Sequence, residues 1–428
     1  MRNSAMSDND TVKSKDILHA YLERSWKSNA KRQLDKGVDL VIGKRDGYFV
    51  WNLEGDRRWV DCGSAGGVHS LGHHPRAVVD VLRKALDDGR DTGLWSVPNA
   101  AYLELQDLLA ELAPVPSLNR SVITLASTTS VDVATMFAFR FTGRQKMLAY
   151  RHGYHGHSGF AALVTGSLEE GVIDHYNLPT NLSTFFERYG DLDELESCIN
   201  KDIAAIIVEA IDYETFAPAD ADYLKRMQEL CRRNGALFIL DETRTGIGRT
   251  GKLWACSSYD IEPDMIIAGK GLSGGIYPAS AILVREDIYD ACMNQHRYAY
   301  ISSLGGNEIS CLVARKVLET ASAPAFLSNV QQVMGSLKAA LDDVCGEFSQ
   351  ILSPGVAFGG LVTVNAATAE IGRHLSRALF RNGVLAHSVS EIAPFAVKFL
   401  PPLVLDQAGV DLIADALRRS TNELLAAE

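Results

Sequence analysis

Two polar side chains in this sequence directly follow apolar stretches of the kind that form buried strands. Asp241 comes after the run 236–240, and Lys270 comes after the run 265–268 and one glycine. Continuous apolar runs bounded by turn residues are typical of strands in a parallel sheet, which is covered on both faces. Ligands of open α/β sheets bind at the carboxyl ends of such strands. We therefore expect Asp241 and Lys270 to lie at the same edge of a sheet.

An amine and a carboxylate in this arrangement indicate Schiff-base chemistry. Lys270 would bind the aldehyde of pyridoxal 5'-phosphate (PLP), and Asp241 would keep the cofactor's ring nitrogen protonated. Taken singly, an aspartate after a strand is more often a turn or cap residue. A lysine in a glycine-rich loop is more often solvated. The hypothesis therefore depends on the sequence that surrounds both residues.

The segments around both residues are more specific than either residue alone. DETRTGIGRTG at 241–251 is followed by GKGLSGG at 269–275, with 29 positions from Asp241 to Lys270. This combination resembles class III PLP-dependent aminotransferases, the ornithine and ω-amino-acid type, and is close to glutamate-1-semialdehyde aminomutase. The resemblance extends from about residue 36 over nearly the whole chain. It implies an α/β fold of fold type I, with a large domain built on a mainly parallel, seven-stranded type of sheet.

The length of 428 residues also favours more than one domain. The resemblance implies a small α+β domain built from both chain ends. Residues 1–70 would form the N-terminal segment of the small lobe, 71–310 the large PLP-binding domain, and 311–428 the C-terminal small domain. The pattern after residue 308 predicts a helical stretch over 309–341.

Four hydroxyl residues begin a predicted helix after the strand predicted at 121–126. Serine and threonine are ordinary helix caps, but free amides and hydroxyls at a helix N-terminus also bind phosphate. The family usually has Ser-Gly-Thr-Glu here, and this chain has Ser127, Thr128, Thr129 and Ser130. The resemblance implies that the first three bind the cofactor phosphate. The absence of the glutamate leaves a polar position that fits an unusual substrate or reaction.

Four further residues match positions around the cofactor ring in the resembling family. Tyr154 stands in the motif GYHG, where the resemblance implies an aromatic ring stacked on the pyridine ring, with His155 beside it. Without the motif, Tyr154 would be an ordinary half-buried loop aromatic. Glu209 lies near the end of a predicted strand over 204–210, where the resemblance implies a glutamate that orients its neighbours. A carboxylate that caps the next turn is the alternative. Thr243 takes the position of a residue that packs on the other ring face.

Two C-terminal motifs concern a partner subunit and the substrate. SSLGGN at 302–307 resembles STFGGN, which implies that Ser303 reaches the cofactor phosphate of a partner in a homodimer. KFLPPL at 398–403 resembles RxxPPL, in which the arginine grips a carboxylate through two parallel bonds. Lys398 is a point charge and cannot form that clamp. Either carboxylate recognition is weakened, or Lys398 is a solvated residue at a strand end.

Composition and charge exclude some classes of binding partner and indicate the cellular compartment. The formal net charge is −11, which disfavours nucleic acid. Seven cysteines without a CxxC pair fit a reducing compartment. No apolar run approaches the roughly 18 residues of a membrane span, and the first residues, MRNSAMSDND, contain no apolar signal segment. The histidines at 73–74 and 152–157 lack carboxylate or cysteine partners at metal-binding spacing. We expect a cytoplasmic enzyme that binds no metal.

These patterns predict an aminotransferase that moves an amino group between a small-molecule amine or amino acid and a carbonyl acceptor. Lys270 would shuttle the proton in this reaction, and Asp241 would support it. Racemisation, aminomutation, decarboxylation or carbon–carbon bond formation would use the same residues and remain alternatives. A non-catalytic relative is disfavoured because both residues are retained. The substrate is not specified.

Overall fold

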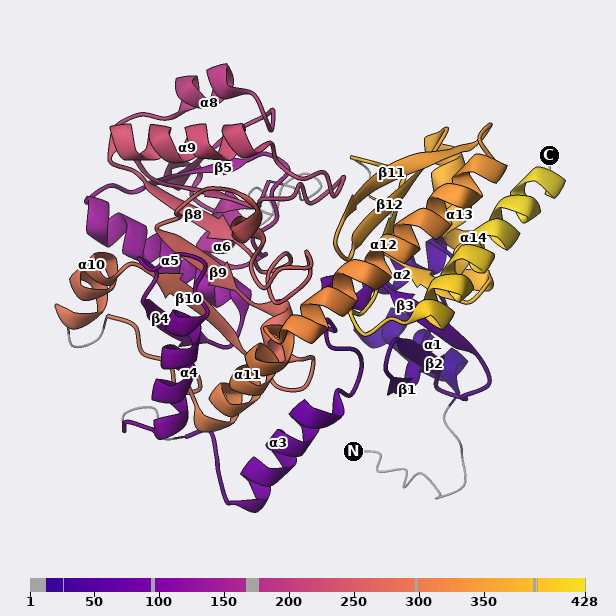
Figure 1. The fold of residues 1–428 in the computed structure, drawn as a ribbon, viewed down its shortest axis with the longest axis horizontal. Helices are drawn as coiled ribbons and strands as arrows, with labels where there is room; N and C mark the ends of the chain where they lie inside the picture. The colour runs from indigo at the N-terminus through magenta and orange to yellow at the C-terminus, as the bar shows by residue number, and fades with distance from the viewer. Residues whose placement is uncertain are drawn as a thin grey trace.

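The computed structural model describes residues 13–25, 27–93, 97–166, 177–296, 299–387, 390 and 392–427. Two lobes lie side by side, and the helices α11 (Glu308–Ala321) and α12 (Pro324–Glu347) run from one to the other (Figure 1). In the described part of the chain, no helix is long and apolar enough to cross a membrane.

The large lobe is built on a seven-stranded sheet of order β4-β10-β9-β8-β7-β5-β6. Strand β10 is antiparallel to both of its neighbours, and all other neighbours are parallel. The prediction of a mainly parallel sheet is therefore confirmed. The strands are β4 (Arg120–Thr124), β5 (Lys146–Tyr150), β6 (Ser183–Phe186), β7 (Ile203–Val208), β8 (Leu237–Asp241), β9 (Met265–Ala268) and β10 (Ser280–Val284).

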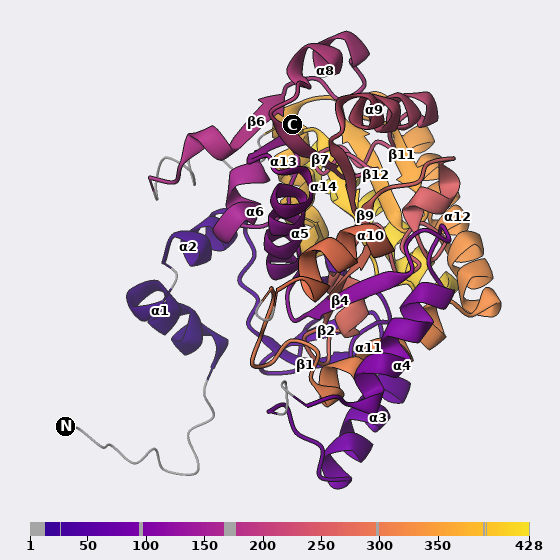
Figure 2. The ribbon, with the colours of Figure 1, turned by 90° about the vertical axis from the view of Figure 1, so that its left-hand side faces the viewer.

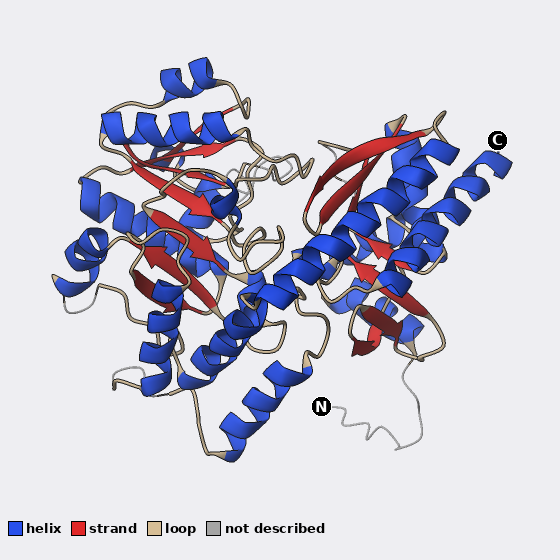
Figure 3. Ribbon diagram, viewed as in Figure 1, coloured by secondary structure: helices blue, strands red, loops and turns tan. Residues whose placement is uncertain are grey.

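Alternate residues of the central strands enter two different cores. In β8, Leu237 and Ile239 pack on one face, and Phe238 and Leu240 pack on the other. Because both faces are apolar, helices must cover both, and Figure 3 shows the sheet between helical layers. One face packs against α3 (Arg76–Asp87), α4 (Ala100–Glu111), α8 (Leu192–Cys198), α9 (Ala221–Asn234) and α11. The other packs against α5 (Ser127–Thr142), α6 (Gly159–Val164), α10 (Glu286–Tyr289) and the π-helical turn η5 (Asp290–Asn294).

The small lobe takes strands from both ends of the chain. One sheet has the order β1-β2-β3-β13, in which β13 lies parallel to β3 with Val384 opposite Val60. The second sheet has the order β11-β12-β14. The strands are β1 (Ile42–Asp46), β2 (Phe49–Asn52), β3 (Arg58–Cys62), β11 (Leu352–Phe358), β12 (Leu361–Ala366), β13 (Val384–Ala386) and β14 (Ala396–Phe399). The helices α12, α13 (Ala369–Arg381) and α14 (Gln407–Ala427) pack on these sheets, whereas α1 (Ser14–Arg24) and α2 (Lys27–Asp35) lie at the edge of the molecule (Figure 2).

The helical stretch expected over 309–341 is two helices. Helix α11 ends at Ala321, and Pro324 occupies the first turn of α12, where proline fits because its missing amide would have no partner. Helix α11 shares the core of the large sheet, whereas α12 packs on α14. The domain limits placed at residues 70 and 310 stay predictions. Short 3₁₀ turns complete the chain: η1 (Ser64–Gly66), η2 (Thr180–Leu182), η3 (Ala255–Ser258) and η4 (Lys270–Ser273).

Candidate active site

Three charged residues meet at the carboxyl ends of neighbouring parallel strands. Glu209 follows β7, Asp241 is the last residue of β8, and Lys270 opens η4 after β9. Strands β7, β8 and β9 are adjacent and parallel, so their ends lie at one edge of the sheet. Asp241 and Lys270 therefore lie on neighbouring strands, as the sequence predicted.

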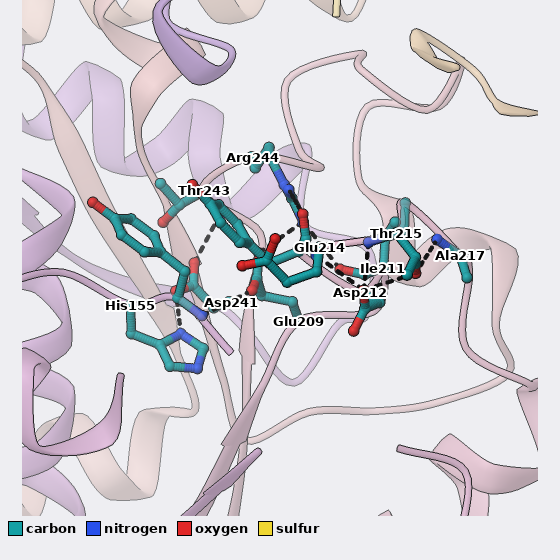
Figure 4. A network of polar contacts seen from close by, with 12 residues as sticks. His155, Glu209, Ile211, Asp212, Glu214, Thr215, Ala217, Asp241, Thr243 and Arg244 are labelled. Carbon is teal, nitrogen blue, oxygen red and sulfur yellow. Dashed lines mark hydrogen bonds and ion pairs between the residues drawn. The ribbon is translucent and has the colours of Figure 1, made fainter. Parts of the chain in front are cut away.

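Asp241 is fully enclosed and held from two sides. Its Oδ2 lies 2.7 Å from His155 Nδ1, and its Oδ1 accepts a 2.9 Å hydrogen bond from the Thr243 amide (Figure 4). Burial acts to raise the pKa of this carboxyl, but His155 and Thr243 together outweigh burial, so the pKa lies below its usual value. Asp241 is therefore a fixed negative charge inside the protein.

Lys270 is half-buried and adopts a left-handed backbone conformation with φ of +40°. Such a conformation is strained for a residue with a Cβ and is typical of functional sites. Its Nζ lies 5.7 Å from the centre of the Tyr154 ring, and a Cβ at Gly66 would lie 3.6 Å from the same Nζ. Burial, and next the Arg244 guanidinium, lower the pKa of Lys270 to about 8. About a tenth of this amine is therefore unprotonated at pH 7, far more than for an ordinary lysine.

Glu209 and Arg244 form a buried ion pair beside Tyr154. Glu209 Oε1 lies 3.1 Å from Arg244 Nη2, and Glu209 Oε2 accepts a 3.1 Å bond from the Tyr154 amide (Figure 4). Arg244 also donates to the carbonyl oxygens of Tyr213 and Ile211, each at 3.1 Å. Glu209 thus fixes the loop that carries Tyr154, which agrees with its predicted orienting role.

Lys398 is not solvated. It lies in β14 with 1% of its surface exposed, and its Nζ is 3.4 Å from Glu214 Oε2. Burial lowers the pKa of Lys398, and Glu214 offsets this only in part. The alternative of a solvated strand-end lysine is therefore wrong. All residues of β14 are buried, and the Lys398 ammonium group meets Glu214 of the loop after β7.

The N-terminus of α5 has no side-chain cap. Its N-cap residue is Ala126, so the amides of the first turn, at Ser127, Thr128 and Thr129, have no partner within the helix. Two glycines approach this turn closely. A Cβ at Gly269 would lie 1.9 Å from Ser127 Oγ, and a Cβ at Gly156 would lie 2.7 Å from Thr128 Oγ1. Bare backbone at both positions lets the loops of Lys270 and Tyr154 lie directly beside the helix end.

Ser130, which takes the place of the family's glutamate, points into the sheet. Its Oγ lies 2.8 Å from Thr124 Oγ1 and 2.8 Å from Ser280 Oγ, and it is fully buried. Ser280 in turn donates to the Ala268 carbonyl. The hydroxyl therefore joins α5 to β4 and β10, so this position does not form the open polar site that the sequence allowed for.

Ser303 lies apart from these residues. It is exposed in the loop before α11, and in the described part of the chain no hydrogen bond joins it to the other predicted site residues. The neighbouring Ser302 Oγ accepts the Leu304 and Gly305 amides, which shapes the loop. The structure thus brings Asp241, Lys270, Tyr154, His155, Glu209 and Thr243 together with the start of α5, and leaves Ser303 at the surface.

The sequence interpretation missed the residues that surround this group. Arg244 pairs with Glu209, and Tyr213 is stacked on Tyr154, whereas Glu214 pairs with the neighbouring Lys398. The local sequence offered only weak signs: Arg244 follows Asp241 by three positions, and two acidic residues flank Tyr213. Neither spacing matches a known motif, so these residues are identified by their partners in the folded protein.

The residues present fit a PLP molecule. Thr243 Oγ1 and His155 Nε2 are buried without a hydrogen-bond partner, and the first turn of α5 offers uncapped amides to a phosphate. An enclosed carboxylate and an amine with a lowered pKa complete the set. Among the described residues, no group of three or more histidine, cysteine, aspartate or glutamate side chains could hold a metal ion.

Comparison with known proteins agrees with this fit. The family model for class III aminotransferases matches residues 31–420. An uncharacterised aminotransferase of Archaeoglobus fulgidus is 34% identical over 409 residues, which are 94% of this chain and 93% of that protein. A [LysW]-aminoadipate semialdehyde/glutamate semialdehyde transaminase of Sulfurisphaera tokodaii is 32% identical over 67% of this chain and 71% of its own length. The crystal structure of ornithine aminotransferase from Toxoplasma gondii has a TM-score of 0.86 at 21% identity and covers 97% of both chains.

The fold is that of fold-type-I PLP enzymes, as predicted from the sequence. The chain belongs to the class III aminotransferases and is a PLP-dependent transferase. The prediction of an aminotransferase that acts on small-molecule amines and carbonyl compounds is confirmed at the level of the family.

Proposed function

We propose that Lys270 and Asp241 carry the aminotransferase reaction of this chain. PLP, when bound, supplies an electron sink that stabilises negative charge on the carbon next to the reacting nitrogen. Lys270 Nζ would hold the cofactor and would then carry the proton between the substrate carbon and the cofactor's carbonyl carbon. Its lowered pKa supports this role, because the amine can accept a proton near neutral pH. Asp241 supplies the negative charge beside the cofactor's ring nitrogen.

The surrounding residues position the cofactor. The amides and hydroxyls of Ser127, Thr128 and Thr129 bind its phosphate at the N-terminus of α5. Tyr154 covers one face of its ring, and Thr243 lies toward the other face.

Two further residues act through their neighbours. His155 holds the Asp241 carboxylate, and Glu209 holds the Tyr154 backbone. One observation carries the proposal: Asp241 and Lys270 lie at the ends of adjacent strands. Asp241 is enclosed and accepts two hydrogen bonds, and Lys270 is half-buried with a strained backbone.

The substrates we propose are a primary amine of a small metabolite and a carbonyl acceptor. Relatives named for acetylornithine and for [LysW]-aminoadipate semialdehyde support an amine at the end of a carbon chain. We further propose a cytoplasmic homodimer in which Ser303 reaches the cofactor phosphate of the partner. The exposed position of Ser303, away from the other site residues, supports this arrangement.

The test begins with the purified protein loaded with PLP. Borohydride reduction followed by peptide mapping is expected to find the cofactor on the peptide that contains Lys270. Addition of an amine donor is expected to release pyridoxamine phosphate, and Lys270→Ala is expected to abolish both results. Cofactor attached to a different lysine would contradict the assignment.

Sedimentation of the holoenzyme tests the assembly. We expect a dimer at assay concentration and weaker PLP retention in Ser303→Ala. A fully active monomer would exclude the proposed role of Ser303.

A further inference from the structure

One loop surrounds two buried cations next to the proposed reaction centre. Residues 209–216, which we call the 209–216 loop, supply Glu209 to Arg244 and Glu214 to Lys398. Arg244 comes from the segment after β8, and Lys398 comes from the small lobe. Their exposed fractions are 4% and 1%. Each cation therefore already has an anion within the protein.

The same loop covers both cations with aromatic rings. The Arg244 guanidinium carbon lies 4.7 Å from the centre of the Tyr213 ring and 5.1 Å from that of Phe216. Lys398 Nζ lies 5.9 Å and 5.5 Å from the same two rings. Cations over aromatic faces gain a favourable interaction and lose contact with water. Tyr213 thus shields both charges.

Tyr213 also contacts the side of the reaction centre. Its ring is stacked on the Tyr154 ring, with centres 4.8 Å apart and an interplanar angle of 15°. Tyr154 in turn lies under Lys270 Nζ. Since Tyr154 occupies one face of the Tyr213 ring, the guanidinium at similar distance must lie over the other face. The contacts therefore run from Lys270 through Tyr154 and Tyr213 to the buried cations.

This arrangement affects any substrate that carries a carboxylate. To reach Lys398, the carboxylate must displace the Tyr213 ring and compete with Glu214. It would also lose its own hydration, which is costly unless a cation is free to replace the water. His387, which pairs with Lys398 through the backbone, has its pKa lowered by burial and by Lys398 to about 3, so it adds no positive charge. Asp212 adds a further negative charge that acts on Lys398. An uncharged group would meet only aromatic surface.

We propose that Tyr213 is a specificity-determining residue that closes the path from Lys270 to Lys398. It directs the enzyme to amines and carbonyl acceptors whose end on that side is uncharged, such as an alkyl, aryl or amide group. This inference rests on the proposed function of Lys270, because it concerns which molecules reach that amine.

The test compares ω-amino acids with alkylamines of the same chain length as amino donors. Removal of the ring in Tyr213→Gly is expected to raise kcat/KM for the ω-amino acid, relative to the alkylamine, by about tenfold or more, the factor expected from one new charge-assisted contact. The matched control Tyr213→Phe keeps the ring and is expected to keep the natural ratio. The double variant Tyr213→Gly/Lys398→Met is expected to lose the gain. An unchanged ratio in Tyr213→Gly, or a gain that persists without Lys398, overturns the proposal.

A binding measurement separates this proposal from the proposed function. Calorimetry of the PLP-loaded protein with glutarate, which has no amine, is expected to show tighter binding to Tyr213→Gly than to the natural protein and to Tyr213→Phe. If no donor yields pyridoxamine phosphate, the proposed function fails, but the glutarate result still decides the role of Tyr213. If Tyr213→Gly does not fold, Tyr213→Leu, which also lacks the flat ring, replaces it in both measurements, and the same results support or overturn the proposal.

Discussion

The protein contains two buried aspartate–histidine pairs with nearly the same geometry. Asp241 Oδ2 lies 2.7 Å from His155 Nδ1, and Asp61 Oδ2 lies 2.9 Å from His73 Nε2. All four side chains are buried. Burial acts to raise the pKa of each aspartate, but the histidine and the neighbouring amides outweigh it, so both pKa values lie below the usual value.

The two pairs differ in the hydrogen bonds that the other carboxylate oxygen, Oδ1, accepts. Asp61 Oδ1 accepts two amides, from Gly63 at 3.0 Å and Ser64 at 2.9 Å, and so fixes the turn after β3. Asp241 Oδ1 accepts one amide, that of Thr243. A carboxylate has about four acceptor positions, so Asp241 keeps more capacity for a ligand. A buried aspartate–histidine pair alone does not identify an active site. Asp241 is the candidate because it also lies at a parallel strand end and keeps unused acceptor capacity.

The largest effect is expected from Asp241→Asn. This change keeps the shape but removes the negative charge beside the proposed position of the ring nitrogen. Turnover is expected to fall on the order of a hundredfold to a thousandfold, as when one partner of a buried ion pair is lost. Steady-state assay of the folded, PLP-loaded variant measures this. Asp61→Asn, as the matched comparison, leaves the charge of Asp241 in place. It is expected to lower turnover by less than about tenfold, through the turn at 63–66 that lies beside Lys270. Equal losses in both variants would remove the distinction between the pairs.

The thermal stability of the two variants is expected to show the opposite order, with Asp61→Asn the less stable. Asp61→Asn leaves a buried histidine and two amides without a charged acceptor, which costs about 3 kcal/mol or more. The midpoint of thermal unfolding of the cofactor-free protein is expected to fall by roughly 3–6 °C. The fall for Asp241→Asn is expected to be smaller, because only one amide loses its acceptor. Scanning calorimetry would contradict this if Asp241→Asn proved the less stable variant.

The reactivity of the Lys270 amine between pH 5 and 9 is expected to follow the titration of Lys270 itself. Both aspartates have lowered pKa values and stay ionised there. Lys270 loses its proton as the pH rises through about 8. In the cofactor-free protein, labelling of its amine is expected to rise about tenfold between pH 7 and 9 and then to level off. Peptide mapping assigns the label to Lys270. If labelling of Lys270 still rises toward pH 10.5, its pKa is that of an ordinary lysine and the prediction is wrong.

The smallest effect is expected from the histidines. His155→Asn retains an amide that can donate to Asp241, so kcat is expected to fall about three- to tenfold, the value of one hydrogen bond. KM for the amine should change little, since His155 acts through Asp241. The matched change His73→Asn is expected to leave kcat as it is and to lower thermal stability. A kcat loss in His73→Asn equal to that in His155→Asn would show that the pairs are not separate.

Local patterns predicted much of the site because its main residues follow strongly apolar strands. The run that ends at Asp241 is buried on both faces, and so is the run before Lys270, which explains why periodicity alone placed both at strand ends. The hydroxyls at the start of α5 were likewise predictable, since a helix start has local signals. The role of Ser130 was not, because its partners come from β4 and β10.

The sequence by itself therefore determined the class of sheet, the strand ends and the pairing of an amine with a carboxylate, because these depend on residues close together in the chain. Only the tertiary structure decided what Arg244 and Lys398 do. Lys398 meets Glu214 across 184 positions, and Arg244 meets Glu209 across 35. A charged residue shows no local sign of whether it will be solvated or paired. That outcome depends on whether folding removes its water and brings an opposite charge within reach, and both lobes contribute to this at Lys398.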